Sequence, residues 1–223
     1  MFVDPKVIDY FTNEMVLVKI DAEKDTVLSK EFHIIGYPTL VMLDKNGKEI
    51  DRMFYSPPDE FLKQAKDYMA GIGTLDDLLK KVAVNPNRDT MFQIADKYKY
   101  RGGDADAEKW YGKVIAAGNP TDSLSGESRM ALADMYRRNK DYNKAVTAFK
   151  AIATDFAGKP IVADAEYYIG DTYRRAKDTA NAISAYETWL QHNPTADTSD
   201  VAYVKKVIEK LKNPPPPKAE EKK

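Results

Sequence analysis

Along the first 70 residues, the spacing of hydrophobic positions changes between helical and extended. Asp4 and Pro5 predict a helix start, an N-cap followed by a proline in the first turn, and residues 7, 8 and 11 then form one apolar face. The nearly unbroken apolar run at residues 15–20 predicts instead a strand buried on both faces and internal to a sheet. The two patterns together predict a small α/β unit.

The next segments predict a short helix, a hairpin and a longer helix. Residues 26–32 are expected to be helical, and residues 39–43 form a second buried strand. Residues 44–47 predict a tight turn, after which the more polar residues 49–54 return as an edge strand. Ser56 is the expected N-cap of the longer helix, whose apolar side carries Phe61, Leu62, Ala65 and Met69. Gly71 and Gly73 end this helix at a predicted domain joint.

This order of elements resembles the thioredoxin fold, particularly bacterial thioredoxin-like domains, over residues 3–70. The matching residues are Asp4-Pro5-x-Val7, Val18-Lys19-Ile20-Asp21, Gly36-Tyr37-Pro38-Thr39, Asp44-x-x-Gly47-Lys48 and Phe61-Leu62. The resemblance implies that Pro38 follows a cis peptide bond and that Tyr37, Pro38 and Thr39 dock extended peptide substrates. It also implies a location in the bacterial periplasm or envelope.

The sequence departs from that family at its redox centre. The family's first central strand and its Cys-x-x-Cys helix would lie upstream of Met1, and that strand would separate the two buried strands predicted here. Each buried main-chain group left unpaired costs about 1 to 3 kcal/mol. Three outcomes stay open: the two strands close up, another segment fills the gap, or Met1 is an internal methionine. The last is favoured, and the upstream reading frame tests it.

The second half of the chain repeats one pattern three times. An alanine follows a tyrosine by nine positions in each copy, in the pairs Tyr98 and Ala107, Tyr136 and Ala145, and Tyr173 and Ala182. An aromatic residue comes four positions after each alanine, and an apolar–small pair precedes each tyrosine. The pattern resembles the tetratricopeptide repeat, a helical hairpin that buries its apolar face by stacking on its neighbours.

The expected fold is therefore α/β plus all-α: an N-terminally incomplete thioredoxin-like domain followed by a tetratricopeptide α-solenoid. The predicted boundaries are residues 1–72 for the first domain, 73–88 for a linker helix and 89–195 for three repeats. Residues 199–212 supply an apolar face for a capping helix. The proline- and lysine-rich residues 213–223 cannot bury enough apolar area to fold and predict a disordered tail.

In the tetratricopeptide family, ligands lie in a concave groove formed by the first helix of each repeat. Matching the repeats by their tyrosines places on that face Phe92, Asp96, Met130, Asp134, Tyr167 and Asp171. Arg138 and Arg175 sit near the ends of two of these helices. Cations at a helix C-terminus need no ligand, because they complement the helix dipole by about 0.3 to 1 kcal/mol. The alternative is that both arginines bind an acidic or C-terminal peptide.

Composition narrows the chemistry further. The chain has 34 basic and 35 acidic residues, a net charge of -1, which gives no general attraction to nucleic acid. It contains no cysteine, so this chain alone performs no thiol redox chemistry. His33 and His192 are the only histidines and lie far apart in the chain. The sequence therefore predicts no metal site, no cofactor and no membrane-spanning segment.

The sequence thus predicts a non-enzymatic scaffold or adaptor that binds a protein or peptide through the repeats. A first alternative is the truncated form of a thiol-disulfide oxidoreductase whose cysteines lie upstream of Met1. A second is a cysteine-free thioredoxin-like domain that holds peptides around Tyr37, Pro38 and Thr39.

Overall fold

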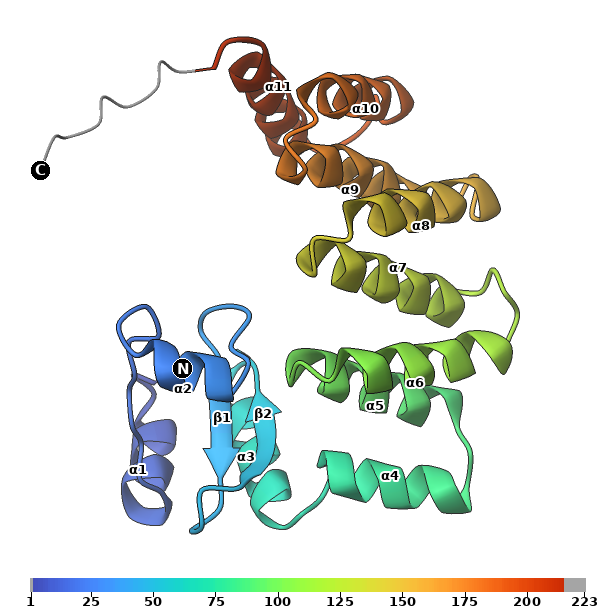
Figure 1. Cartoon of the computed structure of the whole chain (residues 1–223). Coiled ribbons are helices and arrows are strands. Elements are labelled where there is room, and N and C mark those ends of the chain that lie inside the picture. Colours follow the sequence, from blue (N-terminus) through green and yellow to red (C-terminus); the bar gives the residue numbers. More distant parts are fainter. Residues whose placement is uncertain (1, 215–223) are drawn as a thin grey trace, which may run out of the picture. The chain divides into compact units, whose positions relative to one another are not determined.

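The computed structural model describes residues 2–214, and the chain divides into two compact units (Figure 1). Unit 1 extends to Ala117 and combines the predicted α/β part with the linker helix and the first predicted repeat. Unit 2 begins at Gly118 and is helical throughout its described part. The predicted tail lies outside the described residues, apart from Asn213 and Pro214.

The N-terminal part of unit 1 contains the elements α1 (Pro5–Glu14), α2 (Thr26–Glu31), β1 (Leu40–Leu43), β2 (Glu49–Met53) and α3 (Pro58–Met69). The predicted start of α1 is confirmed, since the Asp4 carboxylate accepts the Lys6 amide at 2.9 Å. One core joins α1, the hairpin and α3, and its fully buried members include Val7, Met53 and Phe61.

The hairpin of β1 and β2 forms as the sequence predicts. The strands pair antiparallel, and the Asp44 carboxylate accepts the amides of Asn46 at 2.8 Å and Lys48 at 3.0 Å. Gly47 closes the turn with a φ of 80°, a left-handed conformation that suits glycine. Just before β1, the Tyr37–Pro38 peptide bond is cis, which confirms that expectation.

The strand predicted at residues 15–20 is wrong. These residues follow α1 as an extended segment outside any strand, and the described sheet contains only β1 and β2. Val16 and Val18, expected to be buried, are 92% and 69% exposed. An apolar, β-branched segment becomes a strand only where a neighbouring strand accepts and donates its main-chain hydrogen bonds, and no described strand does so here. For the same reason β1 buries only Met42 instead of its whole length.

Other expectations for this part have mixed outcomes. β2 lies at an edge of the described sheet, as expected, yet its polar residues Asp51 and Arg52 are buried, at 1% and 5% exposed. The N-cap of α3 is Pro57, not Ser56, and no side chain caps this helix. Along α3, Phe61 and the other predicted core residues are buried except Met69, which is 52% exposed; Tyr68 takes its place.

The remaining helices of unit 1 are α4 (Leu75–Val84), α5 (Arg88–Tyr100) and α6 (Asp104–Ala116). Thr74 caps α4 by accepting the Asp77 amide at 3.3 Å, and the apolar face of α4 packs against α5. Trp110 of α6 is partly buried and packs against this core.

A buried carboxylate ties the hairpin to α4 and α5. Asp51 of β2 accepts the Leu75 amide at 2.9 Å and binds Lys97 Nζ at 2.8 Å and an Arg101 guanidinium nitrogen at 3.1 Å. Arg52, the next residue, donates to the backbone carbonyls of Phe32 and Tyr100. The polar character of β2 therefore serves internal contacts of unit 1.

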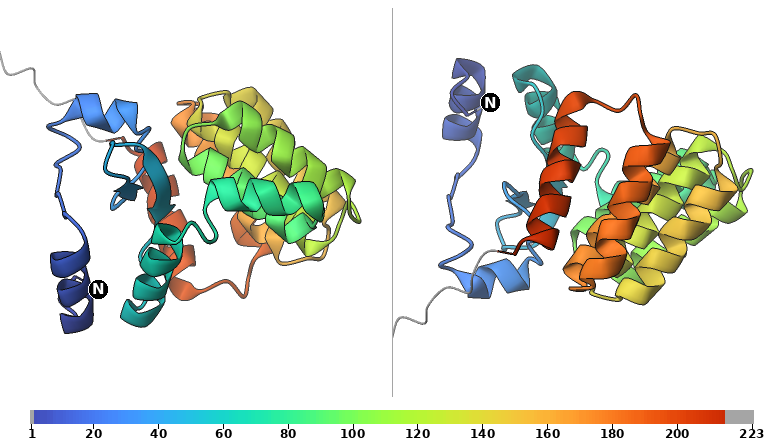
Figure 2. Two further views of the ribbon diagram at one scale, coloured as in Figure 1. Left: turned by 90° about the horizontal axis from the view of Figure 1, so that it is seen from below. Right: turned by 90° about the horizontal axis from the view of Figure 1, so that it is seen from above.

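Unit 2 consists of α7 (Ser123–Arg138), α8 (Tyr142–Asp155), α9 (Ile161–Arg175), α10 (Thr179–His192) and α11 (Thr198–Lys212). Each helix packs against the next one along the chain, as the ribbons in Figure 2 show. Phe149, Ile152 and Ala165 are central to the core between α7, α8 and α9. The predicted capping helix is α11, which buries Val204 and Ile208 against Tyr186 and Trp189 of α10.

Candidate partner-binding surface

The last turns of α7 and α9 bring six charged side chains together. α7 and α9 are the first helices of two consecutive hairpins and contact one another directly. Each ends in an aspartate followed, three and four positions later, by two arginines. Residues three and four apart share a helix face, so both arginines of each helix reach their own aspartate. We call this set the arginine cluster: Asp134, Arg137, Arg138, Asp171, Arg174 and Arg175.

Arg137 is the central member of the arginine cluster. Its guanidinium binds Asp134 within α7, with Nε 3.0 Å from the carboxylate, and crosses to Asp171 of α9 at 2.8 Å. The Arg137 side chain is 10% exposed and that of Asp171 is 6% exposed. The guanidinium also lies over the Tyr168 ring, 5.2 Å from its centroid. Arg137 is therefore a structural link between the two hairpins and is not free to bind a ligand.

The other three arginines are more exposed. Arg138 binds Asp134 at 2.8 Å, Arg175 binds Asp171 at 2.7 Å, and Arg174 also pairs with Asp171. Their side chains are 30%, 49% and 37% exposed in that order. The Nε atoms of Arg138 and Arg174 are buried and have no hydrogen-bond partner among the described residues. The aspartates thus hold these guanidiniums in fixed positions without using all their donors.

The charges of the arginine cluster do not cancel. It contains four guanidiniums and two carboxylates, a surplus of two positive charges. Burial alone would raise the pKa of Asp171, but hydrogen bonds from Arg175 and Arg174 outweigh it and lower the pKa below its usual value. The pKa of Arg137 is raised, because its bonds to Asp134 and the charge of Asp171 outweigh its burial. Asp171 and Arg137 are therefore both ionised at neutral pH.

An aromatic group borders the cluster at α10 and α11. Burial, and then the charge of Asp171, raise the pKa of Tyr186 to about 12. Tyr167 of α9 packs against the rings of Tyr186 and Trp189 at 5.9 and 6.3 Å. Its pKa is also raised, mainly by burial and then by Tyr186 and Tyr203. These hydroxyls are neutral at physiological pH and add no negative charge to the cluster.

The apolar residues predicted for the inner face are half-buried within their own hairpins. Phe92 lies edge-on to Tyr111 at 5.6 Å, and Met130 packs against the core between α7 and α8. Asp96, the equivalent of Asp134 and Asp171 in the first repeat, binds Lys99 at 2.6 Å and the Tyr111 hydroxyl at 2.5 Å. Partner binding by Phe92, Asp96 and Met130 remains a prediction. Of the residues predicted for the groove, only Asp134, Arg138, Asp171 and Arg175 belong to the arginine cluster.

The residues predicted to hold a peptide lie on the surface of unit 1. Tyr37 is 66% exposed, Pro38 is exposed, and the Thr39 hydroxyl donates to the Gly36 carbonyl at 2.6 Å. They immediately precede β1, so they are positioned by the start of the hairpin. The structure places these three consecutive residues together at the surface.

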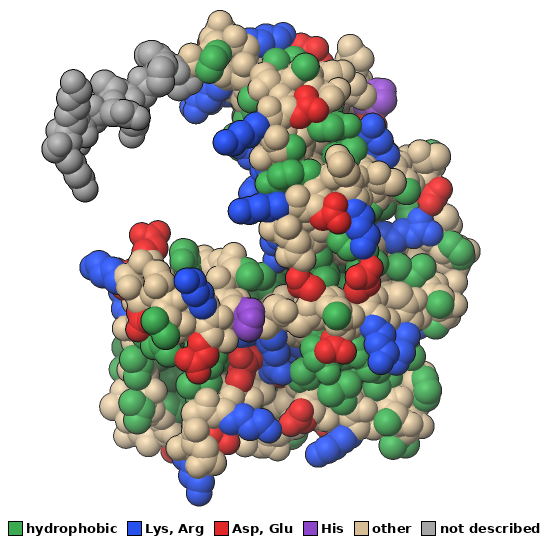
Figure 3. Space-filling model, in the orientation of Figure 1, with side chains coloured by type: hydrophobic (Ala, Val, Ile, Leu, Met, Phe, Trp, Pro, Cys, Tyr) green, Lys and Arg blue, Asp and Glu red, His purple; other side chains and the backbone are tan. Residues whose placement is uncertain are grey.

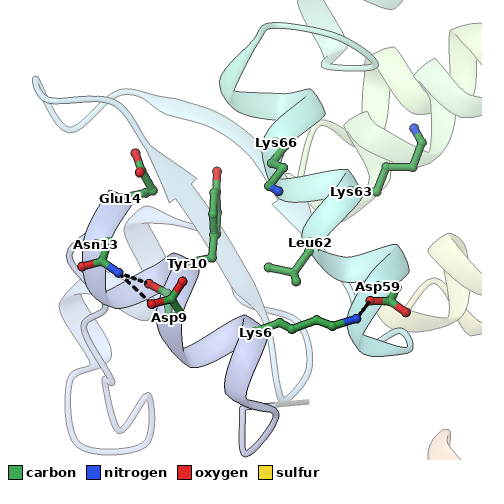
Figure 4. Close-up of a pocket in the computed structure, with 9 residues that line it drawn as sticks. All are labelled: Lys6, Asp9, Tyr10, Asn13, Glu14, Asp59, Leu62, Lys63 and Lys66. Carbon is green, nitrogen blue, oxygen red and sulfur yellow. Dashed lines mark hydrogen bonds and ion pairs between the residues drawn. The ribbon is translucent and has the colours of Figure 1, made fainter.

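Sequence reasoning did not find a pocket of about 640 Å³ between α1 and α3 (Figure 4). Lys6 and Asp59 form an ion pair of 2.9 Å at one side, and Lys66 lies 5.4 Å from the centre of the Tyr10 ring. Its lining has three lysines, Lys6, Lys63 and Lys66, and three acidic residues, Asp9, Glu14 and Asp59. This balanced charge favours neither an anionic nor a cationic ligand.

Within residues 2–214, no group of three or more histidine, cysteine or acidic side chains is arranged to hold a metal ion. His192 instead pairs with Glu166 at 2.6 Å. No helix in the described part of the chain has the length and apolar character needed to cross a membrane.

Comparison with known families identifies the third repeat. Residues 164–196, which contain most of α9 and all of α10, match the family model of the tetratricopeptide repeat. No curated protein matches the chain significantly. Together with the stacked hairpins of unit 2, the match supports a tetratricopeptide-like helical solenoid, an architecture typical of protein–protein interaction.

On the face of the protein drawn in Figure 3, Lys and Arg side chains are interspersed with Asp and Glu side chains on both units.

Proposed function

We propose that this chain is a non-enzymatic scaffold that binds an acidic segment of a protein partner through the arginine cluster of α7 and α9. The observation that carries this proposal is the surplus of two positive charges on side chains already held in place. The side chains of Arg138, Arg174 and Arg175 are exposed enough to reach a ligand.

The fixed positions of these arginines favour binding to carboxylates. A free arginine on a surface loses much rotamer entropy when it pairs, which limits the gain from a simple surface ion pair. Here Asp134 and Asp171 already restrict the guanidiniums, so most of the side-chain entropy of these arginines is lost when the protein folds. Binding a carboxylate then requires little further loss of entropy. Charge-assisted hydrogen bonds to a carboxylate are also stronger than neutral ones.

The test uses a fluorescein-labelled hexaglutamate peptide as the probe, with binding followed by fluorescence anisotropy. The variant Arg138→Gln with Arg175→Gln is expected to bind at least about tenfold more weakly, because two charge-assisted contacts are lost. The affinity of the wild-type chain should fall steeply as salt rises from roughly 50 to 500 mM, since exposed charges are screened.

The matched control removes the same charge elsewhere in unit 2. Lys205→Gln with Lys206→Gln takes two positive charges from the exposed face of α11 and should leave peptide affinity nearly unchanged. An equal loss in both double variants would show a general charge effect and contradict a site at the arginine cluster. Circular dichroism of each variant checks that the helices persist.

A second candidate function rests on the N-terminal part of unit 1. A cis Tyr37–Pro38 bond, an antiparallel hairpin and a following helix occur in the order that a thioredoxin-like domain would have. These features support the proposal of a thioredoxin-like part that holds extended peptides around Tyr37, Pro38 and Thr39. Loss of peptide binding in Pro38→Ala, with the fold retained, is the expected result; unchanged binding would contradict it.

Thiol-disulfide exchange is not expected from this chain. The reaction needs a thiolate, and the sequence has no cysteine. An insulin-reduction assay on the chain should therefore stay at the blank rate. The oxidoreductase alternative requires a Cys-x-x-Cys segment encoded upstream of Met1, and an in-frame stop codon directly before Met1 would exclude it.

A further inference from the structure

The two hairpins that carry the arginine cluster turn in the same way. In each, a lysine lies two positions after the second arginine of the helix, and both lysines have a positive φ, 65° at Lys140 and 62° at Lys177. The equivalent position of the first predicted repeat holds Gly102, with a φ of 74°. A left-handed backbone suits glycine and strains a lysine. Lysine therefore stands at both positions against the preference of the turn, which indicates a role for its charge.

Each of the two turns carries one positive charge more than its aspartates neutralise. We call residues 134–141 the first corner and residues 171–178 the second corner. Each contains three cations and two aspartates: Arg137, Arg138, Lys140, Asp134 and Asp141 in the first, and Arg174, Arg175, Lys177, Asp171 and Asp178 in the second. At each corner one helix ends and the next begins, so the two helix dipoles oppose each other and leave this surplus nearly unchanged.

The two surplus charges are separated by about one helix spacing. Arg138 and Arg175 occupy equivalent positions, each four residues after the aspartate that it binds, at 2.8 Å for Arg138 and 2.7 Å for Arg175. Their separation therefore follows that of the helices that carry them. α7 and α9 contact one another directly, and packed helices lie about 8 to 10 Å apart.

This separation selects the conformation of the ligand. In a β-strand, side chains on one face are two or four residues apart, which is about 7 or 13 Å. In a polyproline II helix, three residues complete a turn of about 9 Å, so positions i and i+3 share a face at the spacing of the corners. Positions i and i+7 of an α-helix also lie about 10 Å apart, but an isolated helix of two turns is unstable in water.

The division of the charge selects the anionic groups. A single phosphate group places almost two negative charges at one point. The surplus here is one charge at each corner, so two carboxylates, one for each corner, match it better. Arginine and lysine also form charge-assisted hydrogen bonds with carboxylates, which are stronger than neutral ones.

We propose that the arginine cluster, together with Lys140 and Lys177, binds a polyproline II segment of a protein partner whose acidic residues occupy positions i and i+3. One carboxylate binds Arg138 and Lys140 at the first corner, and the other binds Arg175 and Lys177 at the second corner. This inference rests on the proposed function, because it assigns a spacing and a conformation to the acidic segment proposed there.

Three proline-based peptides that differ only in spacing test the inference. Each carries fluorescein at its N-terminus, an amide at its C-terminus and two aspartates among prolines, with the second aspartate two, three or four positions after the first. Fluorescence anisotropy with the full chain should show that the three-position peptide binds at least about tenfold more tightly than the other two. Equal affinities of the three peptides would overturn the inference.

Hexaglutamate separates that result from a failure of the proposed function. It contains acidic residues at every spacing and is expected to bind the wild-type chain. If hexaglutamate binds while the three proline-based peptides have equal affinities, the spacing is wrong and the proposed function remains. If hexaglutamate does not bind, both proposals are wrong.

Removal of one corner tests whether a single ligand uses both. Arg175→Gln with Lys177→Gly should lower the affinity of the three-position peptide to that of the other two, because only one of its carboxylates then has a corner to bind. The matched control, Lys205→Gln with Lys206→Gln, removes the same charge from exposed residues of α11 and should keep the preference. A preference that persists in the corner variant would overturn the inference.

The two lysines can be tested without loss of stability. Lys140→Gly with Lys177→Gly places glycine where the backbone is left-handed, so thermal unfolding should occur at or above the wild-type temperature. The affinity for the three-position peptide should nevertheless fall about fivefold, because two cations are lost. Unchanged affinity would show that the lysines do not contact the ligand and would contradict their assignment.

Discussion

Arg137 of α7 donates to the Asp171 carboxylate of α9 at 2.8 Å, and both side chains are almost fully buried. The contact joins the first helices of two consecutive hairpins across 34 positions in sequence. Each partner also has bonds within its own helix, from Arg137 to Asp134 and from Arg175 to Asp171. The arrangement of the arginine cluster therefore depends on how the two hairpins stack.

Replacement of Arg137 by Met should destabilise unit 2 strongly. It leaves the buried Asp171 with fewer partners, and removal of one partner of a buried ion pair costs about 3 to 5 kcal/mol. Urea unfolding followed by circular dichroism measures the change. The control Arg129→Met breaks a more exposed pair with Asp155 and should cost about 1 kcal/mol or less. Similar losses in both variants would contradict the structural role of Arg137.

The lowered pKa of Asp171 predicts how stability changes with pH. An unfolded aspartate has a pKa of about 3.9, and the folded one is lower, so its charged form favours the folded state. That contribution is complete above about pH 4 and is lost as pH falls through the folded pKa. Asp171→Asn should therefore differ from the wild type in unfolding free energy at pH 6, with a difference that shrinks below about pH 4. A difference that stays constant over this range would contradict the pKa shift.

Asp51 should be the main polar contact that holds the hairpin to α4 and α5. Asp51→Ala leaves Lys97 and Arg101, 15% and 19% exposed, without this carboxylate and should cost about 3 kcal/mol of stability. The matched control, Asp59→Ala, breaks an ion pair on the exposed surface and should have little effect on stability. Urea unfolding measures the stability of both variants. A larger loss for Asp59→Ala would show that the buried contact is unimportant.

Gly170 of α9 is required by the close approach of α10. A Cβ atom there would lie 2.7 Å from Cδ1 of Tyr186, which is itself buried, so Gly170→Ala should destabilise unit 2 by about 1 to 3 kcal/mol. Gly112→Ala in α6 is the matched change, since nothing lies within 4 Å of its added Cβ. It should stabilise the chain by about 0.5 to 1 kcal/mol through helix propensity. Thermal unfolding measures both, and equal effects would contradict the packing argument.

The repeat pattern predicted more of the structure than the N-terminal pattern did. Ala107, Ala145 and Ala182 are each fully buried, because a helical hairpin buries its apolar face mainly against neighbours close in sequence. The spacing of Asp134 and Asp171 from their arginines is one at which ion pairs form within a helix, and these pairs are present. It did not predict the bond from Arg137 to Asp171, which depends on the stacking of two helices.

By itself, the sequence determined the elements whose causes are local: the Asp4 cap of α1, the turn at Gly47, and the repeated helices with their salt bridges. Only the tertiary structure decided which extended segments became strands and which polar residues became buried. Val16 is as suited to a strand as Val41, but pairing requires a neighbour at hydrogen-bonding distance. Asp51 is buried instead of exposed because Leu75, Lys97 and Arg101, distant in sequence, converge on its carboxylate.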